Sequence, residues 1–139
     1  MDAPSPVPAG WDFSNPWYHG SSQRLELLLA GSTITQDRDL ARVFSHKPPM
    51  VSITDDPLEL AAGVPRLQHN GEHPGLLYVI DEPLGPADVY PHPRTSMPPG
   101  LEWLTRRPLR LRLLGPVGVR PAEFLTPQAI EELLRRHSA

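Results

Sequence analysis

The sequence predicts a small α+β domain built from short strands and a few short helices. The chain has 139 residues, which fits one domain of ordinary size. Its 19 prolines lie well above the ~5% of average usage and exclude an architecture of long helices. Leucine and arginine alternate over residues 109–113, with the period of a strand that has one exposed face. Residues 126–137 carry apolar residues at helical spacing and indicate a final helix.

The chain is expected to divide into a tail and one folded part. Residues 1–15 begin with MDAPSPVPAG, which is rich in proline and small residues and predicts a flexible N-terminal tail. Residues 16–139 form the predicted single domain, with the final helix at its end.

Three further helices are expected, one of them over residues 54–63, where Thr54 or Asp55 is the expected N-cap and Pro57 lies in the first turn. Residues 23–30 place Leu25, Leu28 and Leu29 at helical spacing, and residues 37–44 carry a second apolar face. In contrast, residues 66–75 read RLQHNGEHPG and predict a polar loop.

The strands are predicted from short apolar runs. Residues 50–54 form one such run, and residues 76–83 form the most apolar one, which is typical of a central strand. Residues 85–100 are a connection rich in proline, and a loop of this length in a compact domain is often functional.

Charge and composition narrow the class of protein. The net charge is −3 and the pI is about 6.0, so there is no basic surplus for a dedicated nucleic-acid binder. The absence of cysteine excludes disulfides and thiolate metal sites. Without a leader or a run of ~20 apolar residues, the sequence predicts a cytoplasmic protein with no membrane contact.

His19, within the stretch YHGS at residues 18–21, raises the first functional question. A histidine at a strand end can simply bond a nearby carbonyl. Alternatively, its imidazole can hydrogen-bond a sugar hydroxyl while Gly20 lets the ligand approach the backbone. Both interpretations remain open on the residues alone.

Three blocks in order carry a resemblance to a known family. They are YHGS at 18–21 followed by AGSTIT, VSITDDPLELAAG at 51–63, and GLLYVIDEPLGPADVYPHP from residue 75 with GLEWLTRRPLRLRLLGPV ending at residue 117. This series, over residues 16–119, resembles the ADP-ribosyltransferase superfamily and its small bacterial rifamycin-modifying members. The resemblance implies a split β-sandwich, NAD as substrate, and transfer of ADP-ribose to a small-molecule acceptor. A rifamycin-type antibiotic such as rifampicin is the first acceptor expected, with antibiotic resistance as the role.

The resemblance also implies a set of NAD-binding residues. His19, Gly20 and Ser21 correspond to the motif that holds an NAD ribose. Ser52 occupies the place of a tyrosine that stacks on nicotinamide in the family. Stacking must then come from another ring, for which Tyr18, Tyr90 and Trp103 are the candidates.

Two carboxylates compete for the catalytic role. Glu102 stands where the superfamily often has its glutamate, at the front of a late strand, and is slightly favoured. Asp88 is near the position of the functional aspartate in the rifamycin-type members. Either could instead be an exposed acid that is solvated or paired with an arginine, and Arg106 and Arg107 are available to Glu102.

Several alternatives stay open. The same scaffold serves protein or nucleic-acid ADP-ribosyltransferases and NAD glycohydrolases, and the missing tyrosine also allows a non-catalytic NAD-binding module. No metal is expected, because the i, i+4 pair His69 and His73 falls in a predicted loop rather than on a helix.

Overall fold

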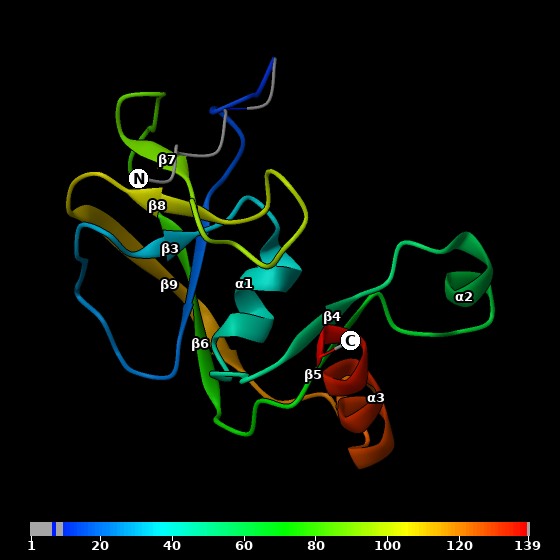
Figure 1. The fold of residues 1–139 in the computed structure, drawn as a ribbon. Helices are drawn as coiled ribbons and strands as arrows, with labels where there is room; N and C mark the ends of the chain where they lie inside the picture. The colour runs from blue at the N-terminus through cyan, green and yellow to red at the C-terminus, as the bar shows by residue number, and fades with distance from the viewer. Residues whose placement is uncertain (1–6, 8–9, 139) are drawn as a thin grey trace.

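The structure is a computed structural model that describes residue 7 and residues 10–138. Within that part the chain is α+β, with antiparallel pairing between its strands (Figure 1). The elements in order are β1 (Tyr18–Ser21), β2 (Leu27–Leu28), β3 (Thr33–Ile34), α1 (Arg38–Phe44), β4 (Val51–Ile53), α2 (Pro57–Ala61), β5 (Leu67–His69), β6 (Gly75–Ile80), β7 (Val89–Pro91), β8 (Trp103–Thr105), β9 (Leu109–Val117), the 3-10 helix η1 (Pro121–Glu123) and α3 (Pro127–Ser138).

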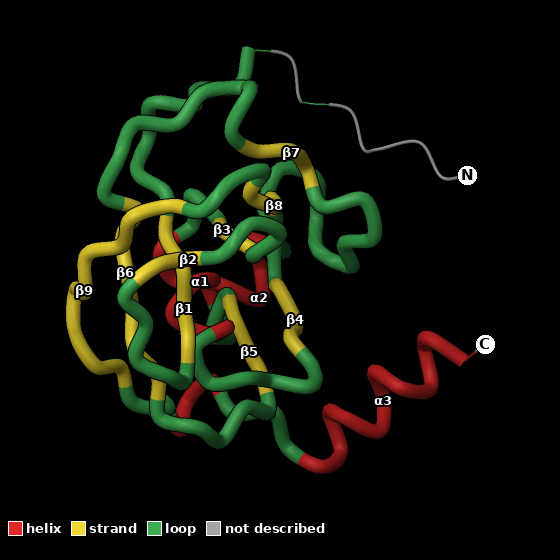
Figure 2. The backbone as a smooth tube through the Cα atoms, turned by 90° about the vertical axis from the view of Figure 1, so that its left-hand side faces the viewer, coloured by secondary structure: helices red, strands yellow, loops and turns green. Residues whose placement is uncertain are grey.

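The strands of the described residues form three sheets. The largest has the order β1-β6-β9-β2, a second has the order β3-β8-β7, and β4 pairs with β5 alone. β6 lies between β1 and β9, which confirms the central strand predicted from its apolar run (Figure 2). β9 contains the predicted alternating segment 109–113.

The main core is built around Trp103, which is fully buried. The rings of Trp11, Phe13 and Trp17 surround it at centroid distances of 5.2, 5.6 and 5.4 Å. The packed core therefore includes Trp11 and Phe13, which lie inside the segment 1–15 that was expected to be a tail. Residues 1–6 and 8–9 of that segment lie outside the described residues.

A second core lies under α1. Leu40 and Val43 of α1 and Leu67 of β5 are buried together, and Met97 and Leu101 pack against them. The predicted helix 37–44 is confirmed here, because the Asp37 side chain caps it by accepting the Leu40 N–H at 3.1 Å.

Two predicted elements are wrong. Residues 23–30 form no helix; instead Leu28 is buried in β2, which pairs with β9, while Leu29 is 68% exposed. A strand pairing has therefore overridden the helical spacing. Residues 66–75 include β5 rather than only loop, because β5 pairs with β4 and buries Leu67 and His69.

The remaining helices lie at the edge of the fold. α2 buries none of its residues and stands away from the sheets (Figure 1). α3 confirms the predicted final helix, and the Thr126 hydroxyl accepts the Ala129 N–H at 3.1 Å. Among the described residues, no helix combines the length and the apolar character needed to cross a membrane.

α1 packs on β1 at Gly20. A Cβ atom on this glycine would lie 1.8 Å from the carbonyl oxygen of Ala41 and 2.8 Å from the backbone nitrogen of Ser45. Both neighbours are backbone atoms of a capped helix, so they have little freedom to move aside. Glycine is therefore required at this position for packing.

We predict that Gly20→Ala destabilises the fold by about 2 kcal/mol or more, because overpacking forces α1 away from β1. Urea denaturation followed by tryptophan fluorescence measures the change. Gly118→Ala is the control, since a Cβ there meets nothing within 4 Å and should change stability by less than about 1 kcal/mol. Equal effects of the two substitutions would contradict the packing role.

Candidate functional site

A pocket of about 280 Å³ opens between β1, β3, α1 and the residue before β8. It is lined by Tyr18, His19, Gly20, Thr33, Thr35, Ala41, Phe44, Lys47, Pro48 and Glu102. Four of the residues predicted to form a site, Tyr18, His19, Gly20 and Glu102, therefore lie in one pocket. Glu102 is far from the other three residues in the sequence, and the fold brings them together.

His19 is held on β1 as a neutral hydrogen-bond acceptor. Its Nδ1 lies 2.7 Å from the carbonyl oxygen of Thr33, and because a carbonyl only accepts, Nδ1 carries the proton. Burial lowers the pKa of His19, and the hydrogen bond to Thr33 only partly offsets this. The imidazole is thus neutral near pH 7 and its Nε2 has a lone pair for a ligand. His19 can therefore bond the Thr33 carbonyl through Nδ1 and bind a ligand through Nε2, so the two interpretations of this histidine are compatible.

Glu102 is positioned by its two neighbours in sequence. Leu101 packs on the second core and Trp103 is buried in the main core, so the backbone between them is fixed. The Glu102 Oε1 atom accepts a hydrogen bond from the Thr95 hydroxyl at 2.7 Å. Thr95 Oγ1 in turn accepts the Met97 N–H at 3.0 Å. These contacts hold the carboxylate at the wall of the pocket.

Sequence reasoning missed Lys47 and Phe44, which come from the end of α1. Phe44 is half-buried and offers a flat apolar wall, whereas Lys47 is exposed. The backbone of Lys47 has φ of 51°, a left-handed conformation that is uncommon outside glycine. The signal in the sequence was a lysine between a helix end and two prolines, where the chain must turn sharply.

Ser21 and Ser52 lie outside this pocket. The Ser21 hydroxyl accepts the Gln23 N–H at 3.0 Å and so stabilises the turn after β1. Ser52, on β4, lines a separate cavity of about 320 Å³ together with Gln68 and residues of α3. The family resemblance implied that Ser52 and His19 belong to one site, but the structure places them in separate cavities.

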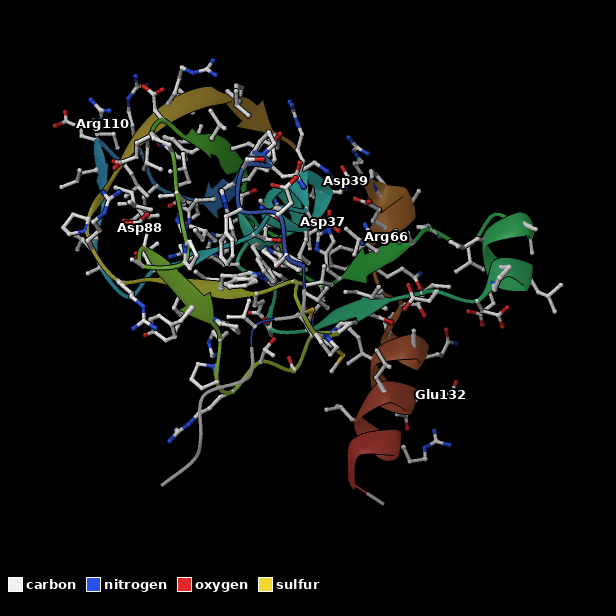
Figure 3. The ribbon with its side chains drawn as sticks, turned by 90° about the horizontal axis from the view of Figure 1, so that it is seen from above. Asp37, Asp39, Arg66, Asp88, Arg110 and Glu132 are labelled. Carbon is white, nitrogen blue, oxygen red and sulfur yellow. The ribbon has the colours of Figure 1, made fainter. Side chains whose placement is uncertain are left out.

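Asp88 is an ion-pair partner rather than a pocket residue. Its Oδ1 lies 2.8 Å from Arg107 Nε, and its Oδ2 accepts the Gly85 N–H at 2.8 Å. The hydrogen bond from Gly85, followed by that from Arg107, lowers the pKa of Asp88. Arg107 also pairs with Glu82. Figure 3 places Asp88 on the opposite side of the molecule from α2.

A buried histidine pair lies outside the pocket. The rings of His46 and His69 stack with centroids 5.4 Å apart, and both Nε2 atoms are buried without a hydrogen-bond partner. Within residue 7 and residues 10–138, no group of three or more histidine or acidic side chains is arranged to hold a metal ion.

Comparisons with known proteins found no match. No protein-family model, no curated protein and no solved structure is similar to this chain. The function of the protein is therefore inferred from the geometry of the pocket and from the motif resemblance.

We predict that His19 keeps its single proton on Nδ1 near neutral pH and titrates below the ordinary value of 6.5. Two-bond ¹H–¹⁵N correlation spectra distinguish the two ring nitrogens and follow the titration. A neutral ring protonated on Nε2, or a midpoint at or above 6.5, would contradict the geometry.

The same shift predicts a loss of stability in mild acid. The unfolded His19 binds a proton near pH 6.5, whereas the folded residue does so only at lower pH, so acid favours the unfolded state. Burial and the charge of His46 lower the pKa of His69, which adds an effect of the same sign. The free energy of unfolding should therefore fall as the pH drops below 6.5, and His19→Asn should make that fall shallower. An unchanged slope in the variant would exclude His19 as a contributor.

Proposed function

We propose that this protein is an NAD-dependent ADP-ribosyltransferase whose active site is the pocket of His19 and Glu102. The observation that carries the proposal is that these two residues, singled out separately in the sequence, line one pocket. The split β-sandwich of the superfamily is part of the same proposal, and the antiparallel sheets are compatible with it.

His19 supports the binding of a ribose. A neutral imidazole that donates from Nδ1 to Thr33 presents Nε2 as an acceptor. A ribose hydroxyl can donate to that nitrogen, which fixes the orientation of the sugar. The pairing of β1 with β6 keeps the ring in place.

Glu102 supports the cleavage step. When the bond between ribose C1′ and the nicotinamide nitrogen breaks, its electron pair leaves with neutral nicotinamide and the positive charge passes to the ribose. A carboxylate beside this carbon stabilises the developing charge. The acceptor hydroxyl then bonds to C1′, and its proton passes to Glu102 or to water.

The other pocket residues suit parts of a dinucleotide. Tyr18 and Phe44 offer aromatic faces for a planar base, in place of the family tyrosine that Ser52 replaces. Lys47 brings a positive charge that attracts the diphosphate. The volume of about 280 Å³ suits one nucleoside half, so the remainder of NAD would extend toward the exposed Lys47.

We predict that Glu102→Gln lowers the rate of nicotinamide release by about 10²–10³-fold, because the amide keeps the shape but loses the charge. Asp88→Asn is the matched control and should stay within a few-fold of the wild type, since Asp88 lies outside the pocket. Chromatography of NAD incubations measures nicotinamide. If Asp88→Asn lowered the rate of nicotinamide release more than Glu102→Gln, the catalytic role would belong to Asp88.

The products separate the remaining alternatives. Mass spectrometry should show one ADP-ribose unit added to a small-molecule alcohol, and rifampicin is tested because the motif resemblance implies it. Free ADP-ribose alone would instead identify an NAD glycohydrolase, and labelled protein or nucleic acid would identify a macromolecular acceptor. NAD binding with no nicotinamide release from the wild type would refute the enzyme and leave a binding module.

A further inference from the structure

A second cavity adjoins the pocket and shares one residue with it. It has a volume of about 340 Å³, and its lining includes Pro91, His92, Thr95, Met97, Pro99 and Glu102. Glu102 also lines the pocket of His19. Glu102 is therefore part of the wall of both cavities.

The second cavity is a fixed part of the loop between β7 and β8. The His92 N–H donates to the Glu102 carbonyl at 3.0 Å, and Trp103 Nε1 donates to the Gly100 carbonyl at 2.9 Å. The Thr95 hydroxyl joins the loop to the Glu102 carboxylate. Because the loop is tied at both ends to β8, the cavity has a defined shape.

The lining determines which ligand would fit. Pro91, Met97 and Pro99 give the cavity apolar walls. His92 Nδ1 accepts the Arg94 N–H at 3.0 Å, so the neutral ring carries its proton on Nε2 and can donate it to a ligand oxygen. The volume lies near the lower end of the ~300–1,000 Å³ usual for ligand sites. It suits a compact molecule and not a whole macrocycle.

We propose that this second cavity is the acceptor site, and that its ligand is a compact, largely apolar alcohol or phenol. This assignment rests on the proposed transferase function. The acceptor hydroxyl reaches Glu102 from the second cavity and the NAD ribose reaches it from the pocket of His19, so that the hydroxyl oxygen and ribose C1′ meet beside this one residue. The oxygen forms a bond to C1′, neutral nicotinamide leaves with the electrons of the broken bond, and the hydroxyl proton passes to the Glu102 carboxylate.

The test uses 2-naphthol as the probe, with NAD and the full chain. Binding is followed by NMR of the methionine methyl groups, and Met97→Leu assigns the Met97 signal. Transfer is followed by mass spectrometry of ADP-ribosyl naphthol, with nicotinamide release measured in the same samples. We expect 2-naphthol to shift the Met97 signal and to receive ADP-ribose.

Pro99→Trp should fill the cavity from an exposed position. It should reduce transfer to 2-naphthol by about tenfold or more, the range that loss of an apolar pocket contact produces. Nicotinamide release into water should continue, because the pocket of His19 is unchanged. Pro93→Trp, also exposed on the same loop and not among the lining residues, should match the wild type.

The outcomes separate this proposal from the proposed function. Nicotinamide release without a Met97 shift or a naphthol product overturns the acceptor site and leaves the transferase function standing. Transfer that Pro99→Trp does not reduce also overturns it. A Met97 shift in a chain that releases no nicotinamide refutes the transferase function itself.

Discussion

The contact between α1 and β1 at Gly20 is the constraint on which the pocket depends. Without a side chain on Gly20, the Ala41 carbonyl can approach the strand so closely that a Cβ atom would lie 1.8 Å away. This approach brings Phe44 and Lys47, at the end of α1, to the same pocket as His19. Gly20 thus shapes the site through helix packing, whether or not a ligand also touches it.

A buried ion pair also fixes α1. Arg42 donates from both terminal nitrogens to Glu123 of η1, at 2.8 and 2.7 Å, and Arg42 is 5% exposed. Burial is the largest single influence and would raise the pKa of Glu123, but the hydrogen bonds and the charge of Arg42, with smaller contributions from Arg120 and His69, together lower it. Because breaking a buried pair leaves an uncompensated charge, α1 is held firmly between β1 and η1. The pocket therefore has a rigid wall.

Sequence patterns identified the elements whose packing is local or strongly apolar. The run in β6, the capped α1 and the Thr126 start of α3 were all readable, because each carries its own signal. Residues 23–30 were misread because pairing of β2 with β9 depends on a distant strand. Ser52 was placed by motif order, which cannot show that β4 and β5 form a sheet of their own. Lys47 was missed because only the fold brings the end of α1 to His19.

The sequence favoured Glu102 only slightly over Asp88, and the partners of the two carboxylates in the structure distinguish them more clearly. The negative charge of Asp88 is balanced by Arg107, and its other carboxylate oxygen accepts the Gly85 N–H. Little of this charge is therefore left to stabilise a developing cation. Glu102 instead takes its hydrogen bond from the uncharged Thr95 hydroxyl, and among the described residues no cation lies within ion-pair distance of it. A carboxylate must keep its charge in order to stabilise a positive ribose carbon. By that criterion Glu102 fits the proposed role better than Asp88, and the loop carrying Thr95 both orients this acid and forms the cavity beside it.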